Sequence, residues 1–579
     1  MILKKRYYKR PLSILYHFFG LICFLSLFSR TFLNLEPETL QWIHTFANIA
    51  MFVFLVEEGL QLLFIGPKKY IAERKLESAV LILVASLMLN AYWDFKNLPL
   101  SPQDISLAVL GIAAFLLLTK SAIRQFLKLP VVVQHRLKAH EVIFLSFIFA
   151  IAVGTFLLKM PGSTYSGVTW IDAFFTATSA VCVTGLSTLQ ITKVFTPVGL
   201  TVIMLLFQIG GLGIMTISMT FASFLAGRLG IGQSVLLKKM FDTETIHEAK
   251  SVFTDILRFT LFFELIGFGL LALNKNLNNV ELSLPVLFEC LFHSVSAFCN
   301  AGFSLYENSL YSLNFGSNLI MVFTLMFLIV SGGLGFPVVI NLFSYFRKSR
   351  IEHHKWQLST HSKLVLASTA VLLFAGFLGF YFLESDSTFA NLGFKNKAIQ
   401  SLFLSVTSRT AGFNLWPTES LTMSGSALLM ILMWIGGAPI STAGGIKCTT
   451  VSIAAVHMFN QLRGKNRCEI FKREISPESI QRALTVIFGS LLLIFFAFIS
   501  LVQLNPNLSA HDLIFETFSA WGTVGLSRGV TDSLSSPSKL VIIFMMFCGR
   551  VGFFSVFSIF LIQYKKNNRR YLKDHITVY

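Results

Sequence analysis

Four short glycine motifs recur along the chain at nearly equal intervals, and this repetition constrains the fold more than any other feature. The motifs are Cys182-Val183-Thr184-Gly185-Leu186, Cys299-Asn300-Ala301-Gly302-Phe303, Arg409-Thr410-Ala411-Gly412-Phe413 and Gly522-Thr523-Val524-Gly525-Leu526. Successive key glycines lie 117, 110 and 113 residues apart. Around each motif the same order returns: an apolar span, a shorter apolar segment that leads into the glycine, and a second apolar span. This order indicates four copies of one structural unit in a single polypeptide.

The composition places these units in a membrane. Of the 579 residues, 54% are hydrophobic and only 13% are charged, which is too little polar surface for a water-soluble globule of this size. Long charge-poor stretches predict twelve membrane spans. Four spans lie within residues 1–138, and the others pair as 139–158 with 195–225, 255–273 with 317–346, 362–383 with 424–460, and 482–504 with 538–563.

The predicted fold class is an all-α polytopic membrane protein with four helix, pore-loop, helix repeats around a pseudo-fourfold pore. The predicted units are an amino-terminal extension of four transmembrane helices at 1–138 and repeats at 139–230, 251–350, 362–464 and 479–579, the last with a cytoplasmic tail. The extension faintly resembles a voltage-sensing module. However, Lys120, Arg124 and Lys128 cluster at one end of its last span, and a sensor helix needs basic residues within the membrane. A packing or regulatory role is therefore the favoured interpretation.

Lysine and arginine gather in loops that fall on one side of the membrane when the spans are counted in this way, as in cytoplasmic loops. The basic clusters lie at 4–10, 68–75, 124–138, 347–355, 463–473 and 565–570. They predict a multi-pass protein of the cell membrane with both termini in the cytoplasm. The net charge of +18 is thus mainly a topology signal, with attraction to anionic membrane lipids as a second effect. We expect no nucleic-acid partner.

The repeated motif suits a dehydrated cation, because rings of backbone carbonyls can replace a hydration shell. Glycine allows the chain to turn its carbonyls inward. Asp172, Glu289, Ile399 and Asp512 stand thirteen residues before the four key glycines. Short pore helices starting there would aim their negative carboxyl ends at the pathway. An isolated glycine motif would indicate close helix packing instead, but four copies in register favour a pore.

A second set of glycine signatures follows 24 to 30 residues after each key glycine, at Gly210, Gly332, Gly436 and Gly549. A helix cannot run smoothly through the third signature, and irregular backbone at membrane depth must line a cavity or be buried in protein. We predict a loop that obstructs the pathway below the glycine motifs. Its residues are Gly436, Gly437, Ala438, Ser441, Thr442, Gly444, Gly445 and Lys447, with Arg550 beside them. Arg550 is either a charge barrier in the ion path or an anchor for loop carbonyls.

On these motifs the chain resembles the Trk/Ktr/HKT superfamily of potassium transporters, from about residue 139 to the end. The resemblance implies a gating loop in the third repeat, potassium as the transported ion, no covalently bound cofactor, a homodimer, and a ring of cytoplasmic nucleotide-binding regulatory subunits. Glycine in all four repeats is the pattern that the family associates with potassium. The implied potassium-binding residues are Val183, Thr184, Gly185, Asn300, Ala301, Gly302, Thr410, Ala411, Gly412, Thr523, Val524 and Gly525.

Three other interpretations are considered: a sodium-dependent or sodium-permeable transporter, an enzyme, and an ion-coupling site at Glu264. A sodium-coupled potassium symporter or a sodium-permeable cation transporter remains an alternative, although a carrier with alternating access would normally show inverted repeats. An enzyme is not expected, because His247-Glu248-Ala249-Lys250-Ser251 fails the HExxH pattern and no other catalytic set stands out. Glu264 within a span marks either an ion-coupling site or a pair with a neighbouring helix, and the second interpretation is favoured.

Overall fold

The structure is a computed structural model that describes residues 139–212, 246–307, 309–311, 318–351, 358–465, 467–553 and 556–557. The predicted amino-terminal extension at 1–138 and the basic carboxyl-terminal tail lie outside these residues. The described part is almost entirely helical, and its strands form one antiparallel pair, β1 (Glu469–Ile470) with β2 (Arg473–Glu474). The expectation of a mostly helical protein is confirmed.

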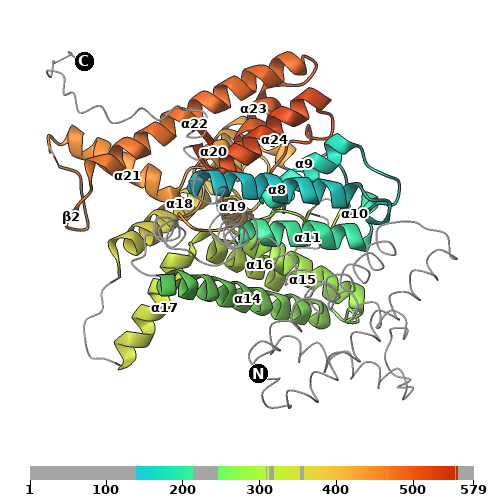
Figure 1. The fold of residues 1–579 in the computed structure, drawn as a ribbon, viewed down its shortest axis with the longest axis horizontal. Coiled ribbons are helices and arrows are strands. Elements are labelled where there is room, and N and C mark those ends of the chain that lie inside the picture. Colours follow the sequence, from blue (N-terminus) through green and yellow to red (C-terminus); the bar gives the residue numbers. More distant parts are fainter. Residues whose placement is uncertain are drawn as a thin grey trace, which may run out of the picture.

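The helices follow one another in four series of similar order (Figure 1). The first series is α8 (Ala139–Lys159), η1 (Pro161–Ser163), α9 (Trp170–Val181), α10 (Ile191–Val194) and α11 (Pro197–Gly211). The second is α14 (Ile246–Leu277), α15 (Leu284–Cys299), α16 (Leu319–Gly333) and α17 (Phe336–Ile351). The third is α18 (Thr360–Glu384), α19 (Phe394–Thr407), η2 (Thr418–Ser420), α20 (Met423–Trp434) and α21 (Cys448–Leu462), and the fourth is α22 (Pro477–Leu504), α23 (Ala510–Gly522) and α24 (Ser536–Val551).

Three of the described helices are long and apolar enough to cross a membrane, namely α18, α22 and the Asp255–Leu277 part of α14. The span predicted at 317–346 is broken, because α16 and α17 meet at an angle of 98°. Gly335 adopts a φ of 84° at the break, and the Phe336 N–H bonds to the Ile440 carbonyl instead of continuing α16. The span predicted at 424–460 is likewise divided, since α20 ends at Trp434 and α21 begins at Cys448.

The helices close into a ring around the short helices α9, α15, α19 and α23. In each series the helix after the short one packs against the short helix of the next series: α11 contacts α15, α16 contacts α19, α20 contacts α23, and α24 returns to α9. The second series lies along one edge of the view in Figure 1 and the fourth along the opposite edge. The carboxyl-terminal halves of the short helices are buried, and Phe175, Phe292 and Phe515 near the middle of their helices are fully enclosed.

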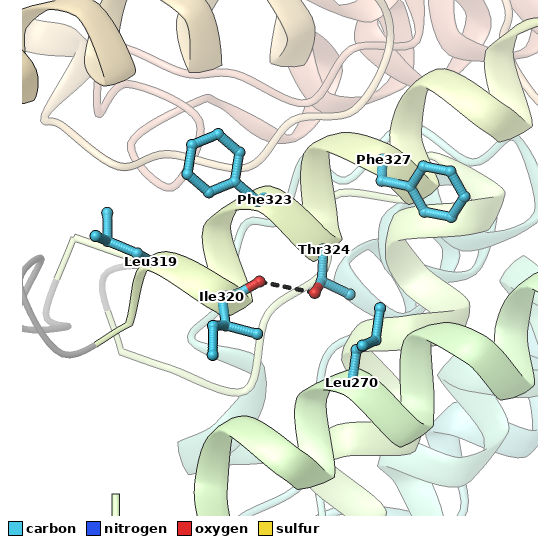
Figure 2. A pocket seen from close by; sticks show the side chains of 6 residues that line it. All are labelled: Leu270, Leu319, Ile320, Phe323, Thr324 and Phe327. Carbon is cyan, nitrogen blue, oxygen red and sulfur yellow. Dashed lines mark hydrogen bonds between the residues drawn. The ribbon is translucent and has the colours of Figure 1, made fainter. Parts of the chain in front are cut away.

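Large apolar side chains cover the outside of the longer helices, as a lipid-facing surface requires. Phe374 on α18 and Phe496 on α22 are both more than half exposed. A shallow apolar groove between α14 and α16 is lined by Leu270, Leu319, Ile320, Phe323, Thr324 and Phe327 (Figure 2). The Thr324 hydroxyl in this groove already donates to the Ile320 carbonyl, at 2.7 Å. The groove therefore offers no site for an ion.

Candidate cation site

The four glycine motifs form the same backbone turn directly after α9, α15, α19 and α23. We call them the four glycine turns. Their key glycines Gly185, Gly302, Gly412 and Gly525 have φ values of 92°, 72°, 77° and 93°. Two positions earlier, Val183, Asn300, Thr410 and Thr523 also have positive φ, at 57°, 60°, 74° and 50°. The residues that stand between these two positions do not have positive φ, namely Thr184, Ala301, Ala411 and Val524. This alternation turns successive carbonyls toward one side of the chain, and the β-branched Val183, Thr410 and Thr523 hold a conformation that is strained for such residues.

The four glycine turns meet in a closed ring. A Cβ built on Gly185 would lie 2.6 Å from the carbonyl oxygen of Ala301, and one built on Gly302 would lie 2.8 Å from that of Ala411. In the same sense, Gly412 faces the carbonyl oxygen of Val524, and Gly525 faces that of Thr184. Each key glycine thus abuts the next turn in chain order, and the fourth returns to the first. The structure therefore brings the predicted residues of all four motifs together around one axis.

Hydroxyl side chains of the short helices hold the turns in place. Ser179 Oγ accepts from the Gly185 N–H at 3.1 Å, and Ser519 Oγ accepts from the Gly525 N–H at 3.2 Å. Ser296 Oγ donates to the carbonyl oxygen of Phe303 at 2.7 Å, and Thr407 Oγ1 donates to that of Phe413 at 2.8 Å. These hydroxyl residues were not predicted from the sequence. A pattern that could have identified them is a serine or threonine five or six positions before every key glycine.

The second set of glycines serves close packing below the turns. A Cβ on Gly210 would collide with the Val181 carbonyl, one on Gly332 with the Phe298 carbonyl, and one on Gly549 with the Trp521 carbonyl. These three carbonyls share one position, four residues before the key glycine. In the third series Gly436 instead meets the Gly444 carbonyl. This departure coincides with the division between α20 and α21.

Residues 435–447 form the glycine-rich loop between α20 and α21, which a parallel bridge from Ile435 to Ile446 closes at its base. The loop is hydrogen-bonded to the second and fourth series. The Ala438 N–H donates to the Gly333 carbonyl at 3.0 Å, and the Gly445 N–H donates to the Gly549 carbonyl at 3.1 Å. Lys447 Nζ donates back to the Ala443 carbonyl at 2.6 Å. The predicted loop residues are thus gathered at one place, and Ala438, Ser441 and Thr442 are buried there.

The glycine-rich loop lies directly against the four glycine turns. Gly444 faces the Thr523 side chain so closely that a Cβ would collide with its hydroxyl. When the Asn300 amide is oriented so that all its atoms find partners, its oxygen accepts from Thr442 Oγ1 at 3.2 Å and its nitrogen donates to the Ala297 carbonyl at 3.0 Å. A displacement of the loop would therefore release contacts of the second and fourth turns.

Arg550 ties the glycine-rich loop to the first series. Its guanidinium is 3% exposed, and it donates through Nη1 to the Thr442 carbonyl and through Nη2 to the Gly210 carbonyl. No described carboxylate forms an ion pair with it. The contacts are of the kind expected for the anchoring role considered from the sequence, and the charge barrier stays a prediction.

Acidic side chains in the first halves of α9, α15 and α23 are held in ion pairs. The Asp172 carboxylate lies 2.7 Å from Lys539 Nζ, the Glu289 carboxylate 2.7 Å from Lys275 Nζ, and the Asp512 carboxylate 2.7 Å from Arg528 Nε. Arg528 also donates to the carbonyls of Thr418 and Glu419 in the third series. Lys539 and Arg528 therefore each join two different series, and the acidic side chains that they pair with have a structural role.

Replacing Lys539 with methionine should destabilise the protein by on the order of 2 kcal/mol, because Asp172 then loses its cation while its side chain is only 11% exposed. The readout is the apparent Tm of the detergent-purified protein, which we expect to fall by about 3 °C. The double variant Asp172→Asn with Lys539→Met should recover part of this loss. A double variant as unstable as the single one would refute the pairing as the cause.

Glu264 lies close to the second glycine motif, because its Oε1 is 3.9 Å from Cys299 Sγ. Its side chain is 5% exposed on α14 and accepts from Gln208 Nε2 of α11 at 3.2 Å. Ser294 Oγ of α15 donates to its backbone carbonyl at 2.7 Å. These contacts support the structural interpretation of Glu264, in which the acid is paired with a neighbouring helix.

Apolar helices that enclose a ring of inward carbonyls define a membrane protein of the kind that transports ions. The family model described as TrkH, a cation transport protein, matches residues 110–570. The chain belongs to this TrkH family of cation transport proteins, which confirms the resemblance drawn from its motifs. The members of this family are ion transporters and not enzymes.

The chain is 37% identical over 445 residues to the potassium/sodium uptake protein NtpJ of Enterococcus hirae, covering 76% of this chain and 96% of that protein. It is also 37% identical over 414 residues to the Ktr system potassium uptake protein B of Bacillus subtilis, covering 71% and 90%. The solved structure of the potassium transporter TrkH from Vibrio parahaemolyticus matches with a TM-score of 0.60 at 18% identity, over 83% of this chain and 98% of that one. This last likeness shows a shared fold.

Proposed function

We propose that the chain is the translocating subunit of a potassium uptake system, with a selectivity filter made by the four glycine turns. The observation that carries the proposal is the closed ring in which each key glycine faces the carbonyl oxygen of the next turn. Four chain segments can surround a dehydrated potassium ion with stacked carbonyl rings. The proposed ligands are the carbonyls of Val183, Thr184, Asn300, Ala301, Thr410, Ala411, Thr523 and Val524, with Gly185, Gly302, Gly412 and Gly525 above them.

The glycine-rich loop is the proposed gate. It lies against the Thr523 side chain below the filter and is fastened to three other series through Gly333, Gly549 and Arg550. A loop held by a few hydrogen bonds at membrane depth can move without disturbing the helices that carry the filter. Arg550 holds the closed position and adds a positive charge next to the path.

The architecture proposed for the membrane has four repeats at 139–230, 251–350, 362–464 and 479–579, an amino-terminal extension of four transmembrane helices at 1–138, and both termini in the cytoplasm of the cell. Basic loops on one side support this orientation. We further propose a homodimer on a ring of nucleotide-binding regulatory subunits, as the resemblance of the motifs implies, and the name of the Ktr system relative supports the presence of partner subunits. Sodium coupling or sodium permeation is the second candidate function, because the printed name of the NtpJ relative includes sodium.

Rubidium uptake into proteoliposomes that contain the purified protein tests the function. We expect uptake driven by an inside-negative voltage without sodium, blocked by external potassium and hardly affected by sodium. Uptake that requires sodium would replace the proposal with coupled symport, and equal potassium and sodium fluxes would refute a potassium-selective filter. Adding ATP or ADP should change nothing until the cognate regulatory subunits are supplied.

A further inference from the structure

One position behind the filter carries a titratable side chain in two of the four series. Nine residues before the key glycines stand Thr176, His293, Phe403 and Glu516. His293 is 1% exposed and Glu516 is 0% exposed. Because the turns close in chain order, the second and fourth series face each other across the axis. Two buried titratable groups are thus placed on opposite sides of the proposed filter.

His293 holds the segment that follows the second turn. Its Nδ1 lies 2.9 Å from the Glu289 carbonyl oxygen, which can only accept, so Nδ1 carries the proton. Its Nε2 then accepts from the Leu305 N–H at 3.3 Å and from Ser304 Oγ at 3.1 Å. Ser304 stands two residues after Gly302. The observed bonds therefore require the neutral imidazole.

Glu516 holds the corresponding segment after the fourth turn. Its Oε1 accepts from the hydroxyl of Ser527, which stands two residues after Gly525, and from Thr531 Oγ1 at 3.0 Å. Ser527 Oγ in turn accepts from the Gly529 N–H at 3.0 Å. The carboxyl group thereby closes residues 527–531 into one hydrogen-bonded unit. Ser304 and Ser527 are equivalent residues held by different chemistry.

We propose that His293 is a positioning residue that holds the segment after the second turn only while its imidazole is neutral, so that external acid lowers potassium selectivity. The inference rests on the proposed function. A protonated Nε2 would point a donor at the Leu305 N–H, which then loses its acceptor. Glu516 holds the opposite segment in a way that does not depend on its charge, because Ser527 and Thr531 both donate to Oε1 and Oε2 has no partner, so a proton on Oε2 leaves both bonds in place.

The acidic groups nearest to His293 and Glu516 are held in ion pairs. Near His293 stand Glu289 and Lys275, which pair at 2.7 Å, and the stacked Tyr306 ring, at 4.8 Å between ring centres. Glu264 of α14 accepts from Gln208 through its carboxylate and from Ser294 through its backbone carbonyl, and α11 and α16 contain no charged residue. Near Glu516 stand Asp512, paired with Arg528, and His511. Of the helices against α23, α20 carries no charge, α22 carries Glu478 and Arg482 near its start, and α24 carries Lys539 and Arg550, whose partners are given above.

The test measures the potassium-to-sodium permeability ratio of the full chain in planar bilayers, with the external side at about pH 7.5 and then at about pH 4, on either side of the usual histidine range. The parent protein should lose selectivity about fivefold in acid, the factor that corresponds to one ordinary hydrogen bond. His293→Gln, which has no titratable group, should abolish this acid effect, whereas Glu516→Gln, which keeps an acceptor oxygen, should retain it. The matched controls His457→Gln and Glu478→Gln, which change titratable residues away from the filter, should retain it.

A second pair of variants tests the same contacts in case the first variants do not fold. Ser304→Ala and Ser527→Ala remove the contacts without altering a titratable group, and each should lower selectivity already at about pH 7.5. A parent that is potassium-selective and unchanged by acid, or a His293→Gln variant that keeps the acid effect, would overturn the inference and leave the proposed function intact. A parent without potassium selectivity at either pH would instead refute the proposed function.

Discussion

Replacing Gly185 with serine should lower the potassium-to-sodium permeability ratio about tenfold or more. Gly185 has a φ of 92°, which residues with a Cβ adopt at a cost of about 1 to 3 kcal/mol. A Cβ there would also lie 2.6 Å from the Ala301 carbonyl oxygen and 3.0 Å from Gly302 Cα. The first turn must therefore shift and carry its carbonyls out of the ring. A change of 1.4 kcal/mol in the preference for one ion is a factor of ten, so a modest displacement suffices.

Gly167→Ser is the matched control for this experiment. Gly167 has a similar φ of 77°, but nothing lies within 4 Å of a Cβ built on it. The control imposes the same backbone strain outside the ring and should leave the permeability ratio unchanged. If the Gly185→Ser protein folds, transports ions and keeps the parental potassium-to-sodium permeability ratio, the assignment of the first turn to the filter is wrong.

Replacing Arg550 with alanine should raise basal cation flux by about tenfold while potassium preference largely persists. The guanidinium donates to the Thr442 carbonyl of the glycine-rich loop and to the Gly210 carbonyl of α11. Its loss frees the loop from the first series and removes a buried positive charge beside the path. Each hydrogen bond from a charged group contributes about 1.5 to 3 kcal/mol, so the loss of two shifts a closed loop substantially toward open. Deleting part of residues 438–445 should act in the same direction.

The control for this variant is Arg482→Ala, which removes an exposed arginine near the start of α22 and should leave flux unchanged. Rubidium flux into proteoliposomes, normalised to the amount of folded protein, gives the comparison. If the Arg550 variant and the loop deletion both fold and conduct no faster than the parent, the loop is structural and the gate lies elsewhere.

The sequence predicted the structure best at positions where the backbone conformation requires a particular residue type. A carbonyl ring needs glycine in every copy, so Gly185, Gly302, Gly412 and Gly525 were visible as a repeat. The glycine-rich loop was visible for a similar reason, because glycine and proline interrupt an apolar pattern. The 98° break between α16 and α17 was missed, since the apolar pattern runs through it and only Gly335 and Pro337 signal the bend.

Contacts between distant segments could not be predicted from local pattern. Nothing near Gly525 in the sequence indicates that it faces the Thr184 carbonyl, and Lys539 gives no sign of its pairing with Asp172 in the first series. The partners of Arg550 are backbone carbonyls, which carry no sequence signal. The spacing of the motifs predicted that four turns exist, whereas their cyclic order depends on how the helices pack.

The location of a bound ion tests the filter most directly. Crystals grown with thallium, which substitutes for potassium and scatters anomalously, should show an anomalous peak on the axis among the carbonyl oxygens of Thr184, Ala301, Ala411 and Val524. Potassium added in excess should displace this peak, and sodium at the same concentration should not. Thallium bound elsewhere in the protein, with none inside the ring of the four glycine turns, would contradict the account.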